Sequence, residues 1–327
     1  MPMESMQKFY AQFRSAFWKN SKFTYFLLNY LRLIIPRKLC QLRLEYELKK
    51  VSDFDREYLQ KRLDYYLKID QKFALKKGEK LSDFKYRARC KNYFFDIYQY
   101  SRYFPDTHTM NYILGDVTEI PEELSFVKSR PIHGENENSV LLKLNKVRHF
   151  VFVNDKRDFE DKEFKLLWRG KANPRKKTRM NFIEEYHNHP LCDIGHINDN
   201  LVDFDYELKE KLPIYEHLKY QFVMSLEGND VATNLKWVMS SNSIAVMPRP
   251  KYETWFMEGT LIPDYHYIEV KDDFSDLIEK ITFYHNNPVA SKEIIRNANK
   301  HVEQFKNKKR EKLLSLLVMD KYFKLQK

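Results

Sequence analysis

Cationic side chains that could bind phosphate are concentrated between residues 168 and 179. This stretch, WRGKANPRKKTR, holds six cations and no acid, follows an apolar run and precedes a helix-forming pattern. A helix N-terminus offers unpaired N–H groups and a partial positive charge, and the fork of an arginine matches two phosphate oxygens. The order of strand, cationic turn and helix therefore predicts a phosphate-binding turn, with an ordinary solvated loop as the alternative.

A second turn of the same kind lies at residues 225–236, SLEGNDVATNLK. It also follows a β-like run and opens a helix, and Asn229 or Asp230 is placed to cap that helix. In doubly wound sheets ligands bind at the carboxyl ends of the strands, where such turns gather. Two such turns in one domain predict a nucleotide or a nucleotide-linked substrate; a capped helix without a ligand is the alternative.

Four residues of zinc-binding types, His187, His189, Cys192 and His196, occur within ten positions. Their spacing matches none of the usual zinc patterns, and Cys192 stands among apolar residues. The sequence also lacks the HExxH, GxSxG and paired CxxC motifs. We therefore expect no metal site, and zinc peptidases, serine hydrolases and zinc ribbons are disfavoured.

Beyond residue 104, short β-like runs alternate with helical patterns, and these elements must position both turns. Such alternation is typical of βα units on a mostly parallel, doubly wound sheet. The expected strands are residues 148–154, 164–168, 220–225, 243–247 and 265–270, and the expected helices are 229–240 and 274–284. Residues 37–104 have no proline and one glycine, which predicts a helical arm, and residues 300–327 predict a final basic helix.

The chain has 327 residues, of which 43% are hydrophobic and 31% charged, enough for two folded domains. Its net charge of +11 predicts an anionic partner, which is nucleic acid, an acidic membrane surface or a phosphorylated ligand. Only seven glycines are present, and no glycine-rich phosphate loop occurs. A basic nucleic-acid-binding protein is one candidate class, but the sequence contains no zinc finger, helix-turn-helix or RNP pattern.

The first 40 residues combine aromatic side chains with seven lysines and arginines and a single acid, Glu4. The apolar run at residues 23–35 is too short to span a bilayer, which requires about 20 residues. Such a segment is able to lie in the headgroup layer of an anionic membrane, and the alternative is a packing helix of the N-terminal domain. With no evident secretory signal and three widely spaced cysteines, we expect a cytoplasmic protein.

Residues 219–305 resemble glycosyltransferase family 90, which includes protein O-glucosyltransferases, capsule xylosyltransferases and bacterial lipopolysaccharide core transferases. The resemblance rests on a glycine turn before a helix and, upstream, on the aromatic-Arg-Gly element at residues 168–170. Its further marks, in chain order, are Arg175, Ser240, Ser241, Ser243, Trp255, Glu258, Pro263, the run His266, Tyr267 and Ile268, and Asp276 with Leu277.

This resemblance implies an α/β protein of the GT-B-like type, with two Rossmann-like lobes facing a cleft, a helical N-terminal arm and a C-terminal helix. The expected parts are residues 1–105 (helical arm and part of the acceptor lobe), 106–150 (remainder of that lobe), 151–305 (nucleotide-sugar donor lobe) and 306–327 (basic helix). It also implies an inverting transferase that needs neither cofactor nor metal and takes a nucleotide-sugar, which we expect to be a UDP-hexose.

The resemblance further implies two groups of site residues. Inversion requires a base on the acceptor hydroxyl and a positive environment under the departing diphosphate. The base of the family lies upstream of the Arg-Gly element, where Asp116 stands in the segment LGDVTEIP; Glu119, Glu122 and Glu123 are rivals. The expected donor-binding residues are Arg169, Gly170, Arg175, Gly228, Thr233, Asn234, Lys236, Ser243 and Glu258.

Lys236 departs from the family's pattern, because eukaryotic members carry an arginine in the helix after the glycine turn. A lysine lacks the bidentate fork, so the diphosphate contacts and the identity of the donor stay open. The absence of a signal favours the bacterial branch of the family, with a lipopolysaccharide core acceptor and a location at the inner face of the bacterial inner membrane. The alternatives are a protein O-glycosyltransferase and a nucleic-acid-binding protein.

Overall fold

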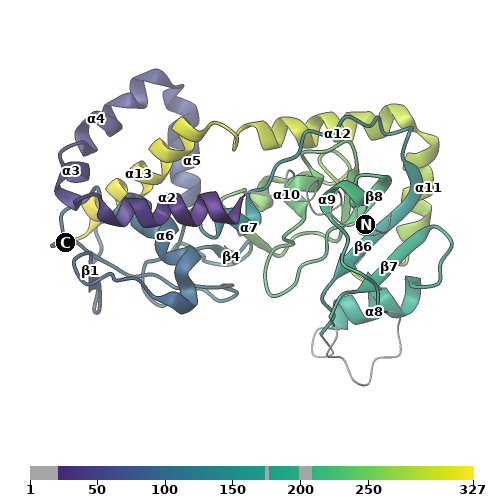
Figure 1. The fold of residues 1–327 in the computed structure, drawn as a ribbon, viewed down its shortest axis with the longest axis horizontal. Coiled ribbons are helices and arrows are strands. Elements are labelled where there is room, and N and C mark those ends of the chain that lie inside the picture. Colours follow the sequence, from purple (N-terminus) through teal and green to yellow (C-terminus); the bar gives the residue numbers. More distant parts are fainter. Residues whose placement is uncertain (1–20, 174–176, 199–207) are drawn as a thin grey trace, which may run out of the picture.

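Five parallel strands form the sheet that organises the C-terminal half of the computed structural model, which describes residues 21–173, 177–198 and 208–327 (Figure 1). The strands are β6 (Glu163–Gly170), β7 (Cys192–His196), β8 (Tyr220–Met224), β9 (Ile244–Met247) and β11 (Ile268–Glu269). Their spatial order is β11-β9-β8-β6-β7, so the chain reverses direction across the sheet between β6 and β8. This order is that of a doubly wound sheet, and the predicted α/β class is confirmed.

One face of the sheet and the helices packed on it enclose a hydrophobic core, whereas Val223, Ala245 and Met247 on the other face belong to the core of the N-terminal part. β8 and β9 consist largely of buried apolar side chains, as strands covered on both faces require. The surrounding helices are α8 (Lys177–Tyr186), α9 (Ile214–His217), α10 (Leu235–Val238), η3 (Glu258–Thr260), α11 (Leu277–Asn286) and α12 (Pro288–Glu303). Side chains of α8, α11 and α12 pack into this core with those of the strands.

Helices dominate the N-terminal part. They are α2 (Lys22–Ile34), α3 (Arg37–Gln41), α4 (Leu44–Lys49), η1 (Lys50–Asp53), α5 (Arg56–Tyr66), η2 (Ala88–Cys90), α6 (Lys91–Ser101) and α7 (Lys146–His149). The short strands form three pairs: β1 (Glu79–Lys80) with β2 (Thr109–Met110), β3 (Ser125–Val127) with β5 (Ser139–Leu141), and β4 (Ser129–Pro131) with β10 (Tyr252–Thr254). In the described part of residues 1–150 the strands form only such two-stranded pairs, of which β3 with β5 is parallel, and not the larger parallel sheet expected of a second Rossmann-like lobe.

The last helix, α13 (Lys308–Leu325), returns to the N-terminal part and packs on α4, α5 and α6. In Figure 1, α12 runs from the sheet toward this helix, so the end of the chain connects both halves. Glu311 of α13 lies in the core, where it forms ion pairs with Arg62 at 2.6 Å and Lys143 at 2.9 Å and accepts a hydrogen bond from Trp255 Nε1 at 2.7 Å. Two cations on one buried carboxylate compensate its desolvation.

Several of the expected elements differ in the structure. The helical arm expected over residues 37–104 is interrupted at 67–87 by irregular backbone and β1, and the strand expected over 265–270 is limited to β11. Residues 148–154 were expected as a strand, but α7 ends at His149 and the following residues are irregular. Phe150, Val151 and Val153 are buried in the N-terminal core, and the Val153 N–H donates to the Ser240 hydroxyl instead of to a neighbouring strand. The helix expected over residues 229–240 is limited to the four residues of α10. Among the described helices, none has the length and hydropathy that a membrane span requires.

Candidate functional site

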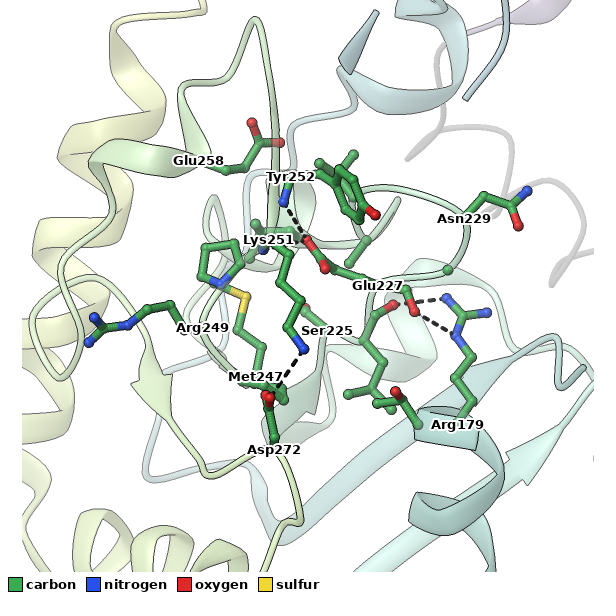
Figure 2. A pocket seen from close by; sticks show the side chains of 18 residues that line it. Arg179, Ser225, Glu227, Asn229, Met247, Arg249, Lys251, Tyr252, Glu258 and Asp272 are labelled. Atoms are coloured by element: carbon green, nitrogen blue, oxygen red, sulfur yellow. Dashed lines mark hydrogen bonds and ion pairs between the residues drawn. The ribbon is translucent and has the colours of Figure 1, made fainter. Parts of the chain in front are cut away.

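A pocket of about 240 Å³ opens at the carboxyl edge of the parallel sheet (Figure 2). It lies at the point where the strand order reverses, because its walls come from the start of α8, which follows β6, and from the turns after β8 and β9. The residues that line it are Thr178, Arg179, Ser225, Leu226, Glu227, Gly228, Asn229, Val231, Ala232, Leu235, Met247, Pro248, Arg249, Pro250, Lys251, Tyr252, Glu258 and Asp272. This is where doubly wound sheets bind their ligands.

Arg179 provides the positive charge beside the glycine turn. Its guanidinium donates to three carbonyl oxygens, those of Lys171 at 2.8 Å, Leu226 at 2.8 Å and Glu227 at 3.1 Å. A Cβ at Gly228 would lie 3.0 Å from Arg179 Nη2, so the glycine allows this close approach. Among the described residues no carboxylate lies within ion-pair distance of Arg179. Burial, together with the charge of Arg148, lowers the pKa of Arg179, as expected for a cation without an anionic partner.

The aromatic-Arg-Gly element supports Arg179 through two of its three residues. The Trp168 ring lies 5.8 Å from the Arg179 guanidinium, and a Cβ at Gly170 would come within 2.5 Å of Trp168 Cζ2. The absence of a side chain at Gly170 therefore allows the Trp168 ring to lie beside the Arg179 guanidinium. The Arg169 guanidinium does not line the pocket: it bonds the Asp193 carboxylate at 2.7 Å and the Asp193 carbonyl at 2.8 Å. Arg175 lies outside the described residues.

Asp116 lies beside the pocket, on the N-terminal side of the site. Its Oδ2 accepts a hydrogen bond from Asn229 Nδ2 at 3.1 Å, and Asn229 lines the pocket. Its Oδ1 is paired with the Lys128 ammonium. Burial acts to raise the pKa of Asp116, but the hydrogen bond and charge of Lys128 outweigh it, so the pKa is lowered and the carboxylate stays ionised at neutral pH. The predicted base is thus brought to the predicted glycine turn.

Asp116 and Asp230 both form ion pairs with Lys128, but they differ in their exposure to solvent. Asp230 is bonded to the Lys128 ammonium at 2.6 Å and to the Ser129 hydroxyl at 2.6 Å. Its side chain is 5% exposed, whereas that of Asp116 is 29% exposed. Burial raises the pKa of Asp230, against the opposing charge of Lys128. Only Asp116 of this pair is therefore open to an incoming acceptor.

The rival carboxylates of the same segment point elsewhere. Glu123 accepts hydrogen bonds from the Lys76 backbone N–H at 3.0 Å and from Asn111 Nδ2 at 2.8 Å, and Glu119 and Glu122 are exposed. None of the three lines the pocket.

Arg148 is a functional candidate that the sequence analysis did not name. Its guanidinium lies 3.5 Å from the Thr233 hydroxyl, and its charge acts on both Asp116 and Arg179. The side chain is exposed. An arginine that reaches Thr233, and through it the expected donor-binding helix, adds a second cation near the pocket. In the sequence, Arg148 stands at the start of the run RHFVFVN, which we interpreted as a strand.

Lys236 and Glu258, both expected to bind the donor, are paired with each other. The Lys236 ammonium lies 2.7 Å from Glu258 Oε1, and both side chains are buried. Glu258 also accepts hydrogen bonds from the backbone N–H and hydroxyl of Thr254, at 2.6 and 2.9 Å. Glu258 lines the pocket, whereas Lys236 does not. In this arrangement the lysine compensates the charge of Glu258 behind the pocket wall.

The remaining expected donor-binding residues fall into two groups. Thr233 and Asn234 stand in the segment after the glycine turn, where Asn234 Nδ2 donates to the Met224 carbonyl at 2.9 Å and fixes the turn to the end of β8. Ser243 precedes β9 and therefore lies at the amino edge of the sheet, opposite the pocket. Its hydroxyl donates to the Tyr220 carbonyl at 2.7 Å and accepts from Lys162 at 3.1 Å. The structure thus separates Ser243 from the other expected residues.

The residues of the histidine-cysteine cluster lie in and beside strand β7 and are not gathered around a common point. Cys192 and His196 begin and end β7, and the Leu191 N–H donates to His189 Nδ1 at 3.2 Å. Over the described ranges, no group of three His, Cys, Asp or Glu side chains is placed to hold a metal ion.

Glu227 lies at the centre of the pocket in Figure 2, where its carboxylate accepts hydrogen bonds from the backbone N–H groups of Lys251 and Tyr252 at 3.1 and 3.2 Å. Burial, reinforced by the charge of Glu258, raises the pKa of Glu227 to about 7, although both N–H bonds act to lower it. The carboxyl is therefore partly protonated near neutral pH. It is able to donate a hydrogen bond to a sugar hydroxyl or to accept one from it.

This raised pKa predicts a pH-dependent effect of Glu227→Gln on stability. A carboxyl with a raised folded-state pKa contributes stability that is complete below the unfolded value of 4.5 and is lost as the pH rises through about 7. The amide oxygen of Gln keeps both N–H bonds but carries no charge. At about pH 8 the free energy of unfolding of the variant should exceed that of the wild type by on the order of 1 kcal/mol, which raises its melting temperature, and at about pH 5 the two proteins should be nearly equal. Thermal melts at both pH values, with Glu122→Gln as the exposed control, test this; an equal difference at both would contradict it.

A family model assigns this fold and site to a class of enzyme. The model described as glycosyl transferase family 90 matches residues 140–327, which include the sheet, the pocket and α13. The chain belongs to this family and is a glycosyltransferase, as the resemblance predicted.

Individual relatives agree with this assignment. The chain is 44% identical to the O-glucosyltransferase LpsA of Dichelobacter nodosus over 271 residues, which cover 83% of this chain and 84% of that protein. It is 24% identical to protein O-glucosyltransferase 3 of Rattus norvegicus over 144 residues, covering 42% of this chain and 27% of the rat protein. A shorter match, 32% identical over 97 residues, is to the uncharacterized protein 179R of Invertebrate iridescent virus 6, and covers 28% of this chain and 8% of the viral protein.

Proposed function

We propose that this chain is an inverting transferase that moves a hexose from a UDP-linked sugar to a hydroxyl of a lipopolysaccharide or lipooligosaccharide core, at the cytoplasmic face of the bacterial inner membrane. The observation that carries the proposal is the hydrogen bond between Asp116 and Asn229, which joins the predicted base to the pocket at the carboxyl edge of the sheet. The name of the 44% identical relative, an O-glucosyltransferase, supports glucose as the first sugar to test.

The donor would occupy the pocket with its diphosphate toward the cationic side. Arg179 has five N–H donors, of which three hold carbonyl oxygens, and the remaining two suit phosphate oxygens. Its guanidinium is not neutralised by a carboxylate of the described residues, so an anionic ligand gains the full interaction. Arg148 adds charge from the N-terminal side of the site.

The reaction then needs one in-line displacement. The ionised Asp116 accepts the proton of the acceptor hydroxyl, and the oxygen forms a bond to the anomeric carbon on the face opposite the diphosphate. The bond between the anomeric carbon and the diphosphate oxygen breaks, and the oxygen leaves with the electron pair, stabilised by Arg179 and Arg148. The lowered pKa of Asp116 keeps it ready to accept a proton but reduces its strength as a base, so the positive environment must stabilise much of the developing charge.

We assign the parts of the chain accordingly. Residues 1–150 would form the acceptor lobe and residues 151–305 the donor lobe of a two-lobed, GT-B-like arrangement, with the basic helix at 306–327 packed back on the acceptor lobe. One of the two hydrophobic clusters consists only of residues between 159 and 295, which supports this division.

The test is a screen of the purified protein with UDP-glucose, UDP-galactose, UDP-xylose and GDP-mannose. We expect the release of UDP from one UDP-hexose. The rate of release should be higher with deacylated lipopolysaccharide core than with water as the acceptor, and EDTA should not change it. The product linkage, followed by NMR, should have the configuration opposite to that of the donor. Retention of configuration, loss of activity with EDTA, or absence of release from all four donors would each contradict the proposal.

The same assay separates the alternative of a protein O-glycosyltransferase, which the match to the rat protein O-glucosyltransferase supports. Folded acceptor domains offered in place of the core would then be glycosylated, and the core would not.

A further inference from the structure

Helix α2 turns most of its apolar residues to solvent, whereas its polar residues Asn29 and Arg32 face the protein. Asn29 is 1% exposed, donates from Nδ2 to the Tyr25 carbonyl at 2.8 Å and accepts from Arg32 Nη1 at 2.7 Å. Tyr25 in turn donates to Asp96 at 2.7 Å, and Arg102 bonds the Arg32 carbonyl at 2.8 Å. These contacts fix the rotation of the helix, so the opposite, apolar side must face outward.

The exposed apolar side chains are concentrated at this helix and the two that follow it. Eleven of the nineteen large apolar side chains that are exposed in the described residues lie between positions 23 and 46. They include Phe23 at 77%, Ile34 at 76% and Leu42 at 82% exposure. We call this set the α2–α4 apolar surface; its members are Phe23, Leu27, Leu28, Tyr30, Leu31, Leu33, Ile34, Ile35, Leu39, Leu42 and Tyr46. Single exposed apolar residues need no explanation, but a continuous set of this kind marks an interaction surface.

Between residues 22 and 43 this surface carries cationic charge only, and the first acid after that stretch is Glu45, beside Tyr46. No acid occurs between Ser5 and Leu44, while Lys22, Lys38 and Arg43 are exposed among the apolar residues. A second copy of the chain would bring two such cationic surfaces together, and their repulsion opposes self-association. An anionic bilayer offers both partners at once, because its headgroups are negative and its acyl region is apolar.

We propose that the α2–α4 apolar surface docks on an anionic lipid bilayer, with α2 lying flat in the headgroup layer and its apolar side toward the acyl chains. α2 has 13 residues, a length suited to lying along the interface. The biological role of this docking rests on the proposed function, because a transferase whose acceptor is anchored in a membrane benefits from binding to that membrane.

The experiment uses the full-length protein and two sets of vesicles, one of mixed phosphatidylglycerol and phosphatidylethanolamine and one of phosphatidylcholine alone. The wild type should sediment with the anionic vesicles at low salt and bind the neutral vesicles much more weakly. Leu27→Glu combined with Leu31→Glu should reduce binding to the anionic vesicles at least about tenfold, because both side chains lose their apolar burial and gain a repelled charge.

Phe283→Glu combined with Val289→Glu is the matched control, since these apolar side chains of α11 and α12 are 54% and 82% exposed and lie outside the surface. This variant should bind vesicles within about twofold of the wild type. Equal loss in both variants, or wild-type binding by the Leu27/Leu31 variant, would overturn the proposal. So would a wild type that binds neither vesicle but is a dimer which the Leu27/Leu31 changes dissociate, a result that assigns the surface to self-association.

An assay of UDP release in the absence of membranes distinguishes a failure of this inference from a failure of the proposed function. The Leu27/Leu31 variant should keep the wild-type hydrolysis rate, because neither residue lies at the pocket. If the wild type binds anionic vesicles but has no transferase activity, the proposed function is rejected and the membrane-docking proposal stands. If it has transferase activity but does not bind vesicles, only the membrane-docking proposal is rejected.

Discussion

Asp116→Asn should abolish sugar transfer and leave donor binding nearly unchanged. Asparagine keeps the size of the side chain and an oxygen for the Asn229 hydrogen bond, but it cannot take the proton of the acceptor hydroxyl. Loss of a general base lowers the rate by about 10²- to 10⁴-fold. The fold should tolerate the change, because Lys128 keeps its ion pair with Asp230. Transfer assays give the rate, calorimetry with UDP gives the affinity, and thermal melts check the fold.

The controls for this variant come from the same segment. Glu119→Gln and Glu122→Gln remove exposed carboxylates that do not line the pocket, and both should retain transfer within about twofold. A transfer rate of Asp116→Asn equal to that of these controls would remove Asp116 from the mechanism. The pH profile is a second measurement: since the pKa of Asp116 is lowered, the wild-type rate should not fall between about pH 8 and pH 6 through protonation of this group.

The approach of Asp116 to the glycine turn depends on long-range packing that local sequence patterns do not contain. The two residues of its hydrogen bond, Asp116 and Asn229, are 113 positions apart, and only the resemblance to a family predicted that they belong to one site. The sheet itself was predictable, because strands such as β8 and β9 are largely apolar runs between turns. β7 was missed since its sequence, CDIGH, contains two potential metal ligands and attracted a different interpretation.

Side-chain direction explains the differences at the donor site. Successive residues of a strand point to opposite faces, so Trp168 and Arg169 have different surroundings: the ring lies beside Arg179, whereas the guanidinium reaches Asp193 on β7. The sequence predicted the cationic cluster at the turn after β6 but did not identify which of its cations lines the pocket. Ser243, by contrast, could have been rejected from the sequence alone, because a residue that precedes a parallel strand lies at the edge opposite the ligand.

Arg179→Met should weaken UDP binding by about 10- to 100-fold, the effect of losing charge-assisted hydrogen bonds. The structure favours Arg179 over Arg169 because Arg179 lines the pocket beside Gly228 and has no carboxylate partner among the described residues, whereas the charge of Arg169 is balanced by Asp193 at 2.7 Å. Arg179→Lys should fall between the wild type and Arg179→Met, because it keeps the charge without the fork. Calorimetry with UDP measures all three proteins, and thermal melts identify any general loss of structure.

Arg169→Met is the decisive comparison, since Arg169 was one of the residues expected to bind the diphosphate of the donor. If the geometry of the site is the one that binds the donor, the UDP affinity of this variant stays close to that of the wild type. The variant loses stability, because among the described residues Asp193 then keeps Lys209, at 3.0 Å, as its one cationic partner. A large loss of UDP affinity in Arg169→Met with none in Arg179→Met would instead restore the sequence-based assignment. It would also mean that donor binding breaks the Arg169–Asp193 pair and turns Arg169 toward the glycine turn, a rearrangement that the cost of separating a half-buried ion pair makes unfavourable.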